Sequence, residues 1–250
     1  MAKILMLLPN EDFDPTESAV PWRVLKDAGH EVFFATGDGT PAQCDQSTLN
    51  GTGLTGMLKS LAAKPKNADI YRQMEADDNF QNPFSWIDAK PEDYDGLVLP
   101  GGHAPGMKPY LESEDVFAIC RNFFERAAPV ASICHGVLAL ARAKNADGRS
   151  LIHNYTLTGM NNFQENIAYK MTKKTFGTHY QTYPTSVQGE VSAVLENSKN
   201  FKPGPMFPAF GSAKHPNKGF IVKHKNLISA RWPGDVYKLA TGFADMLKPK

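Results

Sequence analysis

The chain has 250 residues, of which 27 are lysine or arginine and 26 are aspartate or glutamate, so its formal net charge is only +1. This balance excludes the strong positive field by which proteins attract nucleic acids or anionic membranes. No apolar run approaches the roughly 20 residues of a membrane-spanning helix. The apolar N-terminal stretch is too short for a signal peptide and is better explained as a buried strand. We therefore expect a cytoplasmic protein that binds neither nucleic acid nor membrane.

Cysteines and histidines show no local pattern of a disulfide framework or a metal site. The three cysteines, Cys44, Cys120 and Cys134, cannot all pair, and none lies in a CxxC motif. We expect reduced thiols, as in most intracellular proteins. Because no histidine has H-x-x-x-H or H-E-x-x-H spacing, the sequence predicts no metal site, and we expect no cofactor.

The first predicted elements are a buried strand over Ile4–Leu8 and a helix from about Glu17 to Ala28, followed by a second strand over Glu31–Ala35. Gly29 suits the position just after a helix, where a left-handed backbone is common. Glu17 lies in the first turn of the helix and is expected to face the carboxyl edge of the sheet. An acidic residue there often only complements the helix dipole. A functional role for Glu17 is suggested by its placement after the first strand, beside the strands that carry Gly102 and Cys134.

Residues 37–94 interrupt the alternation of strands and helices. They are rich in Gly, Pro, Asp, Asn and Gln, with short helical patterns around Met57–Ala63 and Ile70–Ala76. Connections within α/β proteins usually take only about 2–6 residues. We therefore predict that this segment is an insertion that caps the carboxyl edge of the sheet.

The next predicted strand, Gly96–Pro100, runs directly into Gly101, Gly102 and His103. Two glycines allow the backbone to turn and to present amide groups to a developing oxyanion. An ordinary glycine turn is the alternative. His103 would either line the same pocket or be a solvated turn residue. A helix is then expected after Ser113, a suitable N-cap residue.

The strongest signal is the segment PVASICHGVLAL at 129–140. An apolar strand, Val130–Ile133, ends at Cys134, and an apolar helical pattern follows Gly136. Small residues on both sides of so sharp a turn are typical of a nucleophile elbow, here with sulfur in place of oxygen. The sulfur would lie near a helix N-terminus, whose partial positive charge stabilises a thiolate. A buried structural cysteine is the alternative.

The C-terminal part is predicted to contain a loop over 198–218, a hairpin of residues 220–223 and 227–230, and a closing helix that begins near Pro233. Together the elements predict one α/β domain over residues 1–250, with a mostly parallel sheet and helices on both faces. Ligands of such sheets bind outside the carboxyl ends of the strands, where Gly102 and Cys134 are expected. We expect the amides of Gly102 and His135 to form an oxyanion hole.

Three motifs together resemble the DJ-one/ThiJ/PfpI superfamily: E-S-A-V-P at 17–21, L-P-G-G-H at 99–103 and S-I-C-H-G at 132–136. The resemblance extends over most of the chain. Its length, its C-H-G triplet and its insertion are similar to the larger branch, which contains holding chaperones and glutathione-independent glyoxalases. The resemblance implies a flavodoxin-like, doubly wound fold related to class I glutamine amidotransferases, and a homodimer.

The resemblance also implies roles for individual residues. Cys134 would be the reactive thiolate and His135 its adjacent base. Glu17 would be the carboxyl group that hydrogen-bonds the sulfur and moves a proton.

Members of the larger branch add an acidic residue downstream of the cysteine, which orients the histidine. The corresponding region here is 158–165, and Glu165 is our choice within it. Asn161 or Asn162 could take the same place, and Asp147 is a weaker acidic alternative.

A thiolate beside a base and a carboxyl group suits addition to an electrophilic carbonyl. The resemblance therefore implies a glyoxalase III-type enzyme that acts on a small 2-oxoaldehyde without glutathione. With methylglyoxal, Cys134 would form a hemithioacetal, and His135 or Glu17 would move a proton through an enediol. Water would then release D-lactate from the resulting thioester.

Other classes of function use the same cysteine. A stress-response chaperone or redox sensor would oxidise Cys134 to a sulfinate stabilised by Glu17. An amidohydrolase or peptidase would use the Cys134–His135 pair. Glutaminase activity is disfavoured because no histidine of the chain is followed two residues later by glutamate.

Overall fold

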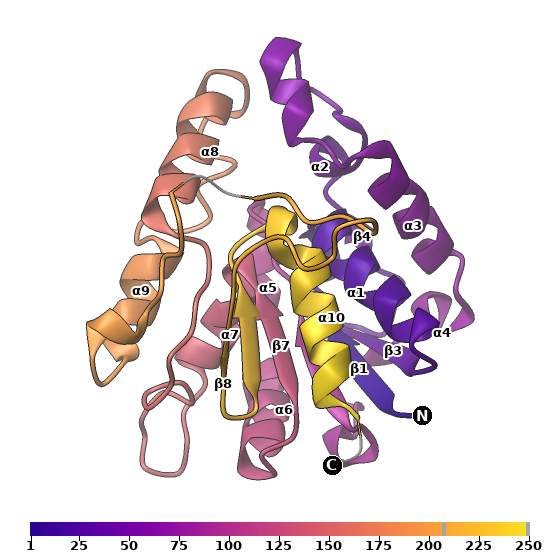
Figure 1. Cartoon of the computed structure of the whole chain (residues 1–250), viewed down its shortest axis with the longest axis vertical. Coiled ribbons are helices and arrows are strands. Elements are labelled where there is room, and N and C mark those ends of the chain that lie inside the picture. Colours follow the sequence, from indigo (N-terminus) through magenta and orange to yellow (C-terminus); the bar gives the residue numbers. More distant parts are fainter. Residues whose placement is uncertain (207–208, 249–250) are drawn as a thin grey trace.

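The computed structural model describes residues 1–206 and 209–248. Its main feature is a seven-stranded sheet in the order β5-β3-β1-β6-β7-β9-β8 (Figure 1). All neighbouring strands are parallel except the antiparallel pair β8 and β9. The strands are β1 (Lys3–Leu7), β3 (Glu31–Thr36), β5 (Phe84–Ser85), β6 (Gly96–Leu99), β7 (Val130–Ile133), β8 (Ile221–His224) and β9 (Leu227–Ala230). The predicted flavodoxin-like α/β fold is confirmed.

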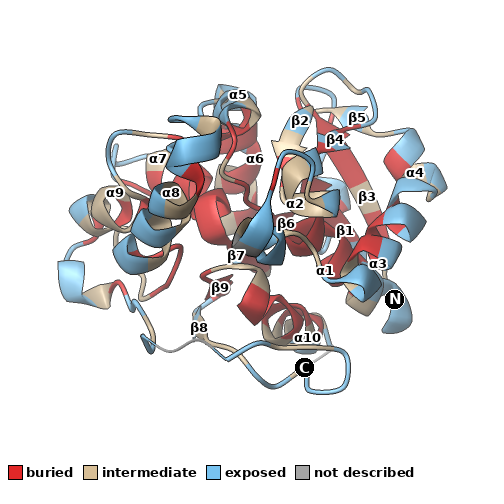
Figure 2. Cartoon of the chain, turned by 90° about the horizontal axis from the view of Figure 1, so that it is seen from above, coloured by how far each residue is buried: buried red, intermediate tan, exposed pale blue. Residues whose placement is uncertain are grey.

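Helices cover both faces of this sheet (Figure 2). One face carries α1 (Pro15–Asp27) and α10 (Val236–Met246), and the other carries α6 (Glu114–Glu125) and α7 (Val137–Arg142). Every residue of β6 and β7 is therefore buried. Burial on both faces explains why these strands are continuous apolar runs rather than alternating ones.

The helix boundaries follow from capping residues. The Asp14 side chain accepts the backbone N–H groups of Thr16 and Glu17 and so begins α1. Gly29 has a φ of +81° just after that helix, as predicted. The hydroxyl of Ser113 caps α6 in the same way as Asp14 caps α1.

Residues 37–94 form more than the predicted cap. They contain β4 (Gln43–Cys44), which pairs with β2 (Glu11–Phe13), then α2 (Gln46–Asn50), a 3-10 helix (Gly56–Leu61), α3 (Pro65–Glu75), α4 (Asp78–Gln81) and β5. Within this segment, α2 lies beyond the carboxyl edge of the sheet (Figure 1). The apolar side of α3 packs against α1 instead, and β5 pairs with β3 and widens the sheet.

Of the two helices after α7, the first lies beyond the carboxyl edge, opposite α2, and the second packs against α7 (Figure 1). They are α8 (Asn162–Phe176) and α9 (Val187–Val194). The hairpin and the C-terminal helix form as predicted, with a 3-10 turn at Pro233–Asp235 before α10. Of the predicted loop over 198–218, residues 207–208 lie outside the described part of the chain. Within the described ranges no helix has the length and apolarity that a membrane span requires.

Candidate active site

Cys134 lies at the sharp junction between β7 and the helical turn that leads into α7. Its φ is +58°, a left-handed backbone that non-glycine residues rarely adopt, and it is only 1% exposed. Such strain recurs at functional sites and is expected of a nucleophile elbow. A Cβ atom on Gly136 would lie 2.3 Å from the Leu99 oxygen. The turn therefore packs directly against the end of β6, and only glycine fits there.

The sheet order places three loops at one point of the carboxyl edge. The chain runs outward from β1 to β3 on one side and from β6 to β7 on the other, so β1 and β6 meet at the topological switch point. Glu17 follows β1, Gly101 follows β6 and Cys134 follows β7. Open α/β sheets bind their ligands at such a crevice.

Glu17 is fully buried between the other two loops. Its Oε2 atom accepts the backbone N–H of Gly101 at 3.0 Å, and its Oε1 atom has no hydrogen-bond partner among the described residues. Burial, followed by the nearby charge of Asp14, raises the pKa of Glu17 well above its ordinary value. The raised pKa favours the protonated carboxyl group, which can donate its proton toward the sulfur.

Gly101 is the point of closest approach between these groups. A Cβ atom there would lie 2.7 Å from the Cβ of Cys134 and 2.8 Å from Oε2 of Glu17. The Gly101 amide is engaged by Glu17, so it is not a free oxyanion donor. The amides of Gly102 and His135 remain the candidates for that role.

His135 lies between the sulfur and a second carboxyl group. Its Nδ1 atom is 3.5 Å from Sγ of Cys134, and its Nε2 atom is 3.9 Å from Oε1 of Glu165. Burial, and then the neighbouring His103, lower the pKa of His135 well below its ordinary value, so the imidazole is neutral and can accept a proton. Burial raises the pKa of Glu165 to about 7, although its Oε2 accepts the Val187 N–H at 3.0 Å.

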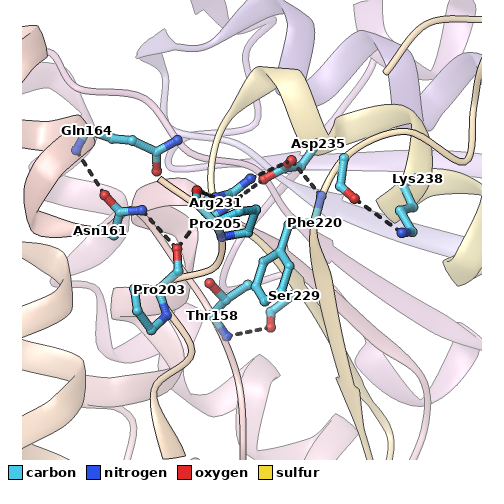
Figure 3. Close-up of polar contacts among 11 residues, drawn as sticks. Thr158, Asn161, Gln164, Pro203, Pro205, Phe220, Ser229, Arg231, Asp235 and Lys238 are labelled. Carbon is cyan, nitrogen blue, oxygen red and sulfur yellow. Dashed lines mark hydrogen bonds and ion pairs between the residues drawn. The ribbon is translucent and has the colours of Figure 1, made fainter. Parts of the chain in front are cut away.

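The alternatives to Glu165 are occupied elsewhere. Asn161 accepts the Gln164 N–H as the N-cap of α8 and donates to the Pro203 oxygen (Figure 3). The side chain of Asn162 accepts from the Ser186 hydroxyl, and Asp147 is exposed. Glu165 is therefore the member of this set that the fold brings to His135.

The protonation of Cys134 differs from the prediction. We expected a thiolate stabilised by a helix N-terminus, but α7 has only six residues and follows a 3-10 turn. Burial, followed by the charges of Glu17 and Asp14, raises the pKa of the thiol well above 9.0, whereas the His135 N–H lowers it. The thiol is thus protonated at rest, and a base must remove its proton as it reacts.

Several neighbours of the sulfur were not predicted. Sδ of Met160 is 3.6 Å from Sγ of Cys134. The Thr182 hydroxyl donates to the His103 oxygen and lies 3.5 Å from Nε2 of His135. Both residues come from the segment around α8, and no local motif marks them.

His103 lies at this site rather than in a solvated turn. Its ring packs edge-on against His135, with 4.6 Å between the ring centroids, and it is half-buried. Burial lowers the pKa of His103 to about 4. The possible ligand atoms of His103, Cys134 and His135 all lie within 4.8 Å of one another. Spacing along the sequence gave no indication of this cluster.

Comparisons with known proteins identify the family of the chain. A ThiJ/PfpI family-like model matches residues 8–205. A deglycase of Pyrococcus horikoshii is 33% identical over 147 residues, which are 59% of this chain and 69% of that protein. A glutathione-independent glyoxalase of Schizosaccharomyces pombe is 26% identical over 149 residues, 58% of each chain. The matched part of the chain thus covers 69% of the length of the deglycase and 58% of the length of the glyoxalase.

Solved structures show the same fold over the whole chain. The glyoxalase III of Candida albicans superposes with a TM-score of 0.68 and covers 99% of this chain and 98% of its own. The two sequences are 18% identical. At this identity the likeness concerns the fold alone.

Proposed function

Since this chain belongs to the ThiJ/PfpI family, we propose that it is a cysteine-dependent enzyme of the glyoxalase III type, which converts methylglyoxal into D-lactate without glutathione. The observation that carries the proposal is the position of Cys134 beside a neutral imidazole and close to the buried Glu17, whose raised pKa favours the protonated form. The relatives named deglycase and glyoxalase support an enzyme of this family.

The first step needs a base, because the thiol of Cys134 is protonated at rest. Nδ1 of His135 is the nearest acceptor, 3.5 Å from the sulfur. As the sulfur–carbon bond forms at the aldehyde, His135 takes the thiol proton and returns it to the former carbonyl oxygen. The amides of Gly102 and His135 are the candidates to stabilise the charge that develops on that oxygen. Glu165 stabilises the transient imidazolium from its other side.

The second step moves a proton between two carbons of the hemithioacetal. The C1–H bond breaks as the C2 oxygen takes up a proton, which gives an enediol. The C1 hydroxyl then loses its proton as C2 gains one, which gives the lactate thioester. His135 and Glu17 lie on either side of Cys134 and are the groups available to carry this proton. General acid–base assistance of this kind contributes about 10²–10⁴-fold.

The third step is hydrolysis. Water adds to the thioester carbonyl, the carbon–sulfur bond breaks, and the sulfur regains its proton. The net reaction adds one water to the 2-oxoaldehyde, so it requires no external oxidant or reductant.

The test is D-lactate formation from methylglyoxal by the reduced protein without glutathione. Cys134→Ser should reduce turnover to the background rate. Glu17→Gln keeps the size of the side chain and should lower kcat by about 10²–10⁴-fold, the range of acid–base assistance. Cys120→Ser is the control, because Cys120 is buried in α6 away from the site and should leave turnover unchanged.

No lactate from the fresh, reduced protein would overturn the proposal, as would full turnover in Cys134→Ser. The name of the Pyrococcus horikoshii relative favours one second candidate, release of an amine from a glycated adduct by the same cysteine. Turnover of a methylglyoxal–lysine adduct faster than of free methylglyoxal would favour that candidate. Suppression of client aggregation that survives Cys134→Ser would point to a chaperone instead.

A further inference from the structure

We propose that His103, Cys134 and His135 form a binding site for a thiophilic divalent cation such as Zn²⁺, which would occupy the nucleophile and so compete with the electrophilic substrate. One thiol and two imidazoles form a borderline-soft donor set that suits this class of cation. Binding itself is independent of the proposed function. Only the predicted inhibition rests on it.

The distance between two of the ligand atoms fits a bound cation. Tetrahedral zinc, with Zn–S and Zn–N bonds of about 2.3 and 2.0–2.1 Å, separates sulfur and nitrogen by about 3.6 Å. Sγ of Cys134 and Nδ1 of His135 are 3.5 Å apart. A cation can therefore bind both atoms without moving either side chain.

His103 supplies the third ligand through a small movement. Its nearest ring nitrogen lies within 4.8 Å of the other two ligand atoms, whereas two nitrogens on one tetrahedral zinc are about 3.3 Å apart. A rotation of the His103 ring closes this difference. His103 is half-buried whereas Cys134 and His135 are buried, so His103 is the member of the three that solvent reaches.

Surrounding groups already hold the ligands as they are held in metal sites. A metal-bound histidine usually donates its other ring N–H to a carboxylate or hydroxyl. Nε2 of His135 faces Oε1 of Glu165 at 3.9 Å and the hydroxyl of Thr182 at 3.5 Å. The same hydroxyl donates to the His103 backbone oxygen and so ties the two histidines together.

The charge around the site favours a cation over a free thiolate. In their ionised forms, Glu17 and Asp14 oppose a negative charge on the sulfur and attract a dication placed there. Binding replaces the sulfur–hydrogen bond by a sulfur–metal bond and releases one proton to solvent. Three protein ligands leave the fourth position open to water or substrate.

The test uses CoCl₂ as a spectroscopic probe of the reduced, full-length protein. We expect one Co²⁺ per chain, with a thiolate-to-cobalt charge-transfer band, the visible bands of tetrahedral cobalt, release of about one proton, and displacement by ZnCl₂. Cys134→Ser should abolish the charge-transfer band. His103→Gln should weaken cobalt binding at least roughly tenfold. Cys120→Ser and His179→Gln are matched controls that should bind cobalt like the wild type.

Absence of a charge-transfer band at millimolar cobalt would overturn the site, as would a band that survives Cys134→Ser. Equal binding by His103→Gln would show that the two histidines only pack against each other. If the protein makes lactate, zinc should inhibit it competitively and a chelator should restore it. If the protein binds cobalt but makes no lactate, the proposed function is wrong and the metal site is supported. If it makes lactate but binds no cobalt, the metal site is wrong and the proposed function is supported.

Discussion

Three carboxyl groups lie near Cys134, of which Glu17 is buried and Asp14 and Glu165 are half-buried, and in each case loss of solvent is the largest cause that raises the pKa. Asp14 shifts to about 6 and Glu165 to about 7, while Glu17 shifts well above its ordinary value. Each group binds its proton more tightly in the folded than in the unfolded chain. The free energy of unfolding therefore falls as the pH rises from the pKa of the group in the unfolded chain to its higher pKa in the folded chain.

Glu165→Gln should isolate one such contribution. For Glu165 the window runs from its ordinary value of 4.5 to about 7, so the wild type has lost this contribution by pH 8. A shift of this size corresponds to at most about 3 kcal/mol. Glutamine keeps an acceptor for the Val187 N–H but never ionises. In urea titrations the variant should therefore be more stable than the wild type at pH 8, by up to this amount, and equal to it at pH 4.5.

Parallel stability curves of the two proteins across this pH range would contradict the prediction. Asp14 and Glu17 titrate in both proteins, so their contributions cancel in the comparison. Activity should change in the opposite sense, because the variant has no carboxylate opposite Nε2 of His135 to stabilise an imidazolium.

At this scale the sequence predicts the residues that local motifs mark. Cys134, His135 and Glu17 were found because each lies in a short motif beside a strand or helix end. Met160 and Thr182 lie equally close to the site but come from irregular chain, where no spacing distinguishes them. Their proximity depends on tertiary packing, which the local sequence does not encode.

Among the elements, β7 was predicted with its observed bounds, because a strand buried on both faces is a continuous apolar run. Helix α8 was not predicted, because almost none of its residues is buried. Thr172 is its only buried residue, so the helix has no apolar stripe and no periodic signal. The two-residue strand β5 is likewise too short for any pattern.

The junction of β7 with the following turn depends on Gly136, and Gly136→Ala should test it. The new Cβ atom would meet two backbone oxygens, 2.3 Å from Leu99 and 2.7 Å from Pro100, which cannot rotate away as a side chain can. We expect about 1–3 kcal/mol of overpacking cost, and reduced turnover because the adjacent Cys134 must shift. Urea unfolding and lactate formation measure the two effects.

Gly148→Ala is the comparison variant. Gly148 has a φ of +73° and open space around its Cβ position, so alanine there carries only the cost of the left-handed backbone, about 1 kcal/mol. Equal stability of the two alanine variants, with unchanged turnover in Gly136→Ala, would show that this contact does not constrain the elbow.

For the molecule as a whole, a buried ion pair joins elements of the C-terminal part of the chain (Figure 3). Arg231 and Asp235 are both inaccessible to solvent, with Nε 2.8 Å from Oδ2. Arg231 also donates to the Pro205 oxygen, and Asp235 accepts the Phe220 N–H. The charge of Asp235 contributes to the raised pKa of Glu17. The pair thus connects the segment before β8, the end of β9 and the start of α10 with the catalytic carboxyl group.

The homodimer, the cytoplasmic location and the single domain over 1–250 stay predictions at this scale. The arrangement of the sheet was predictable because apolar strands alternate with helices along most of the chain. The ion pair was not predictable, since a charged residue in a sequence is normally taken as exposed and only the fold shows that it is enclosed.

Arg231→Met should leave the Asp235 carboxylate buried without its partner, at a cost of about 3–5 kcal/mol in the free energy of unfolding. The double variant Arg231→Met/Asp235→Asn should recover part of that loss, because asparagine still accepts the Phe220 N–H but carries no charge. Urea unfolding of the wild type and both variants measures the difference.

Arg72→Met provides the matched control at an exposed ion pair, since Arg72 and Asp69 are more than half exposed. Exposed pairs contribute about 0–1 kcal/mol, so this variant should unfold almost like the wild type. The prediction would be wrong if Arg231→Met lowered the free energy of unfolding no more than Arg72→Met does. That result would mean that the unpaired charge of Asp235 reaches solvent. A double variant less stable than the single one would instead mean that Arg231 acts through its packing against Phe220, whose ring centre lies 5.0 Å from the guanidinium carbon.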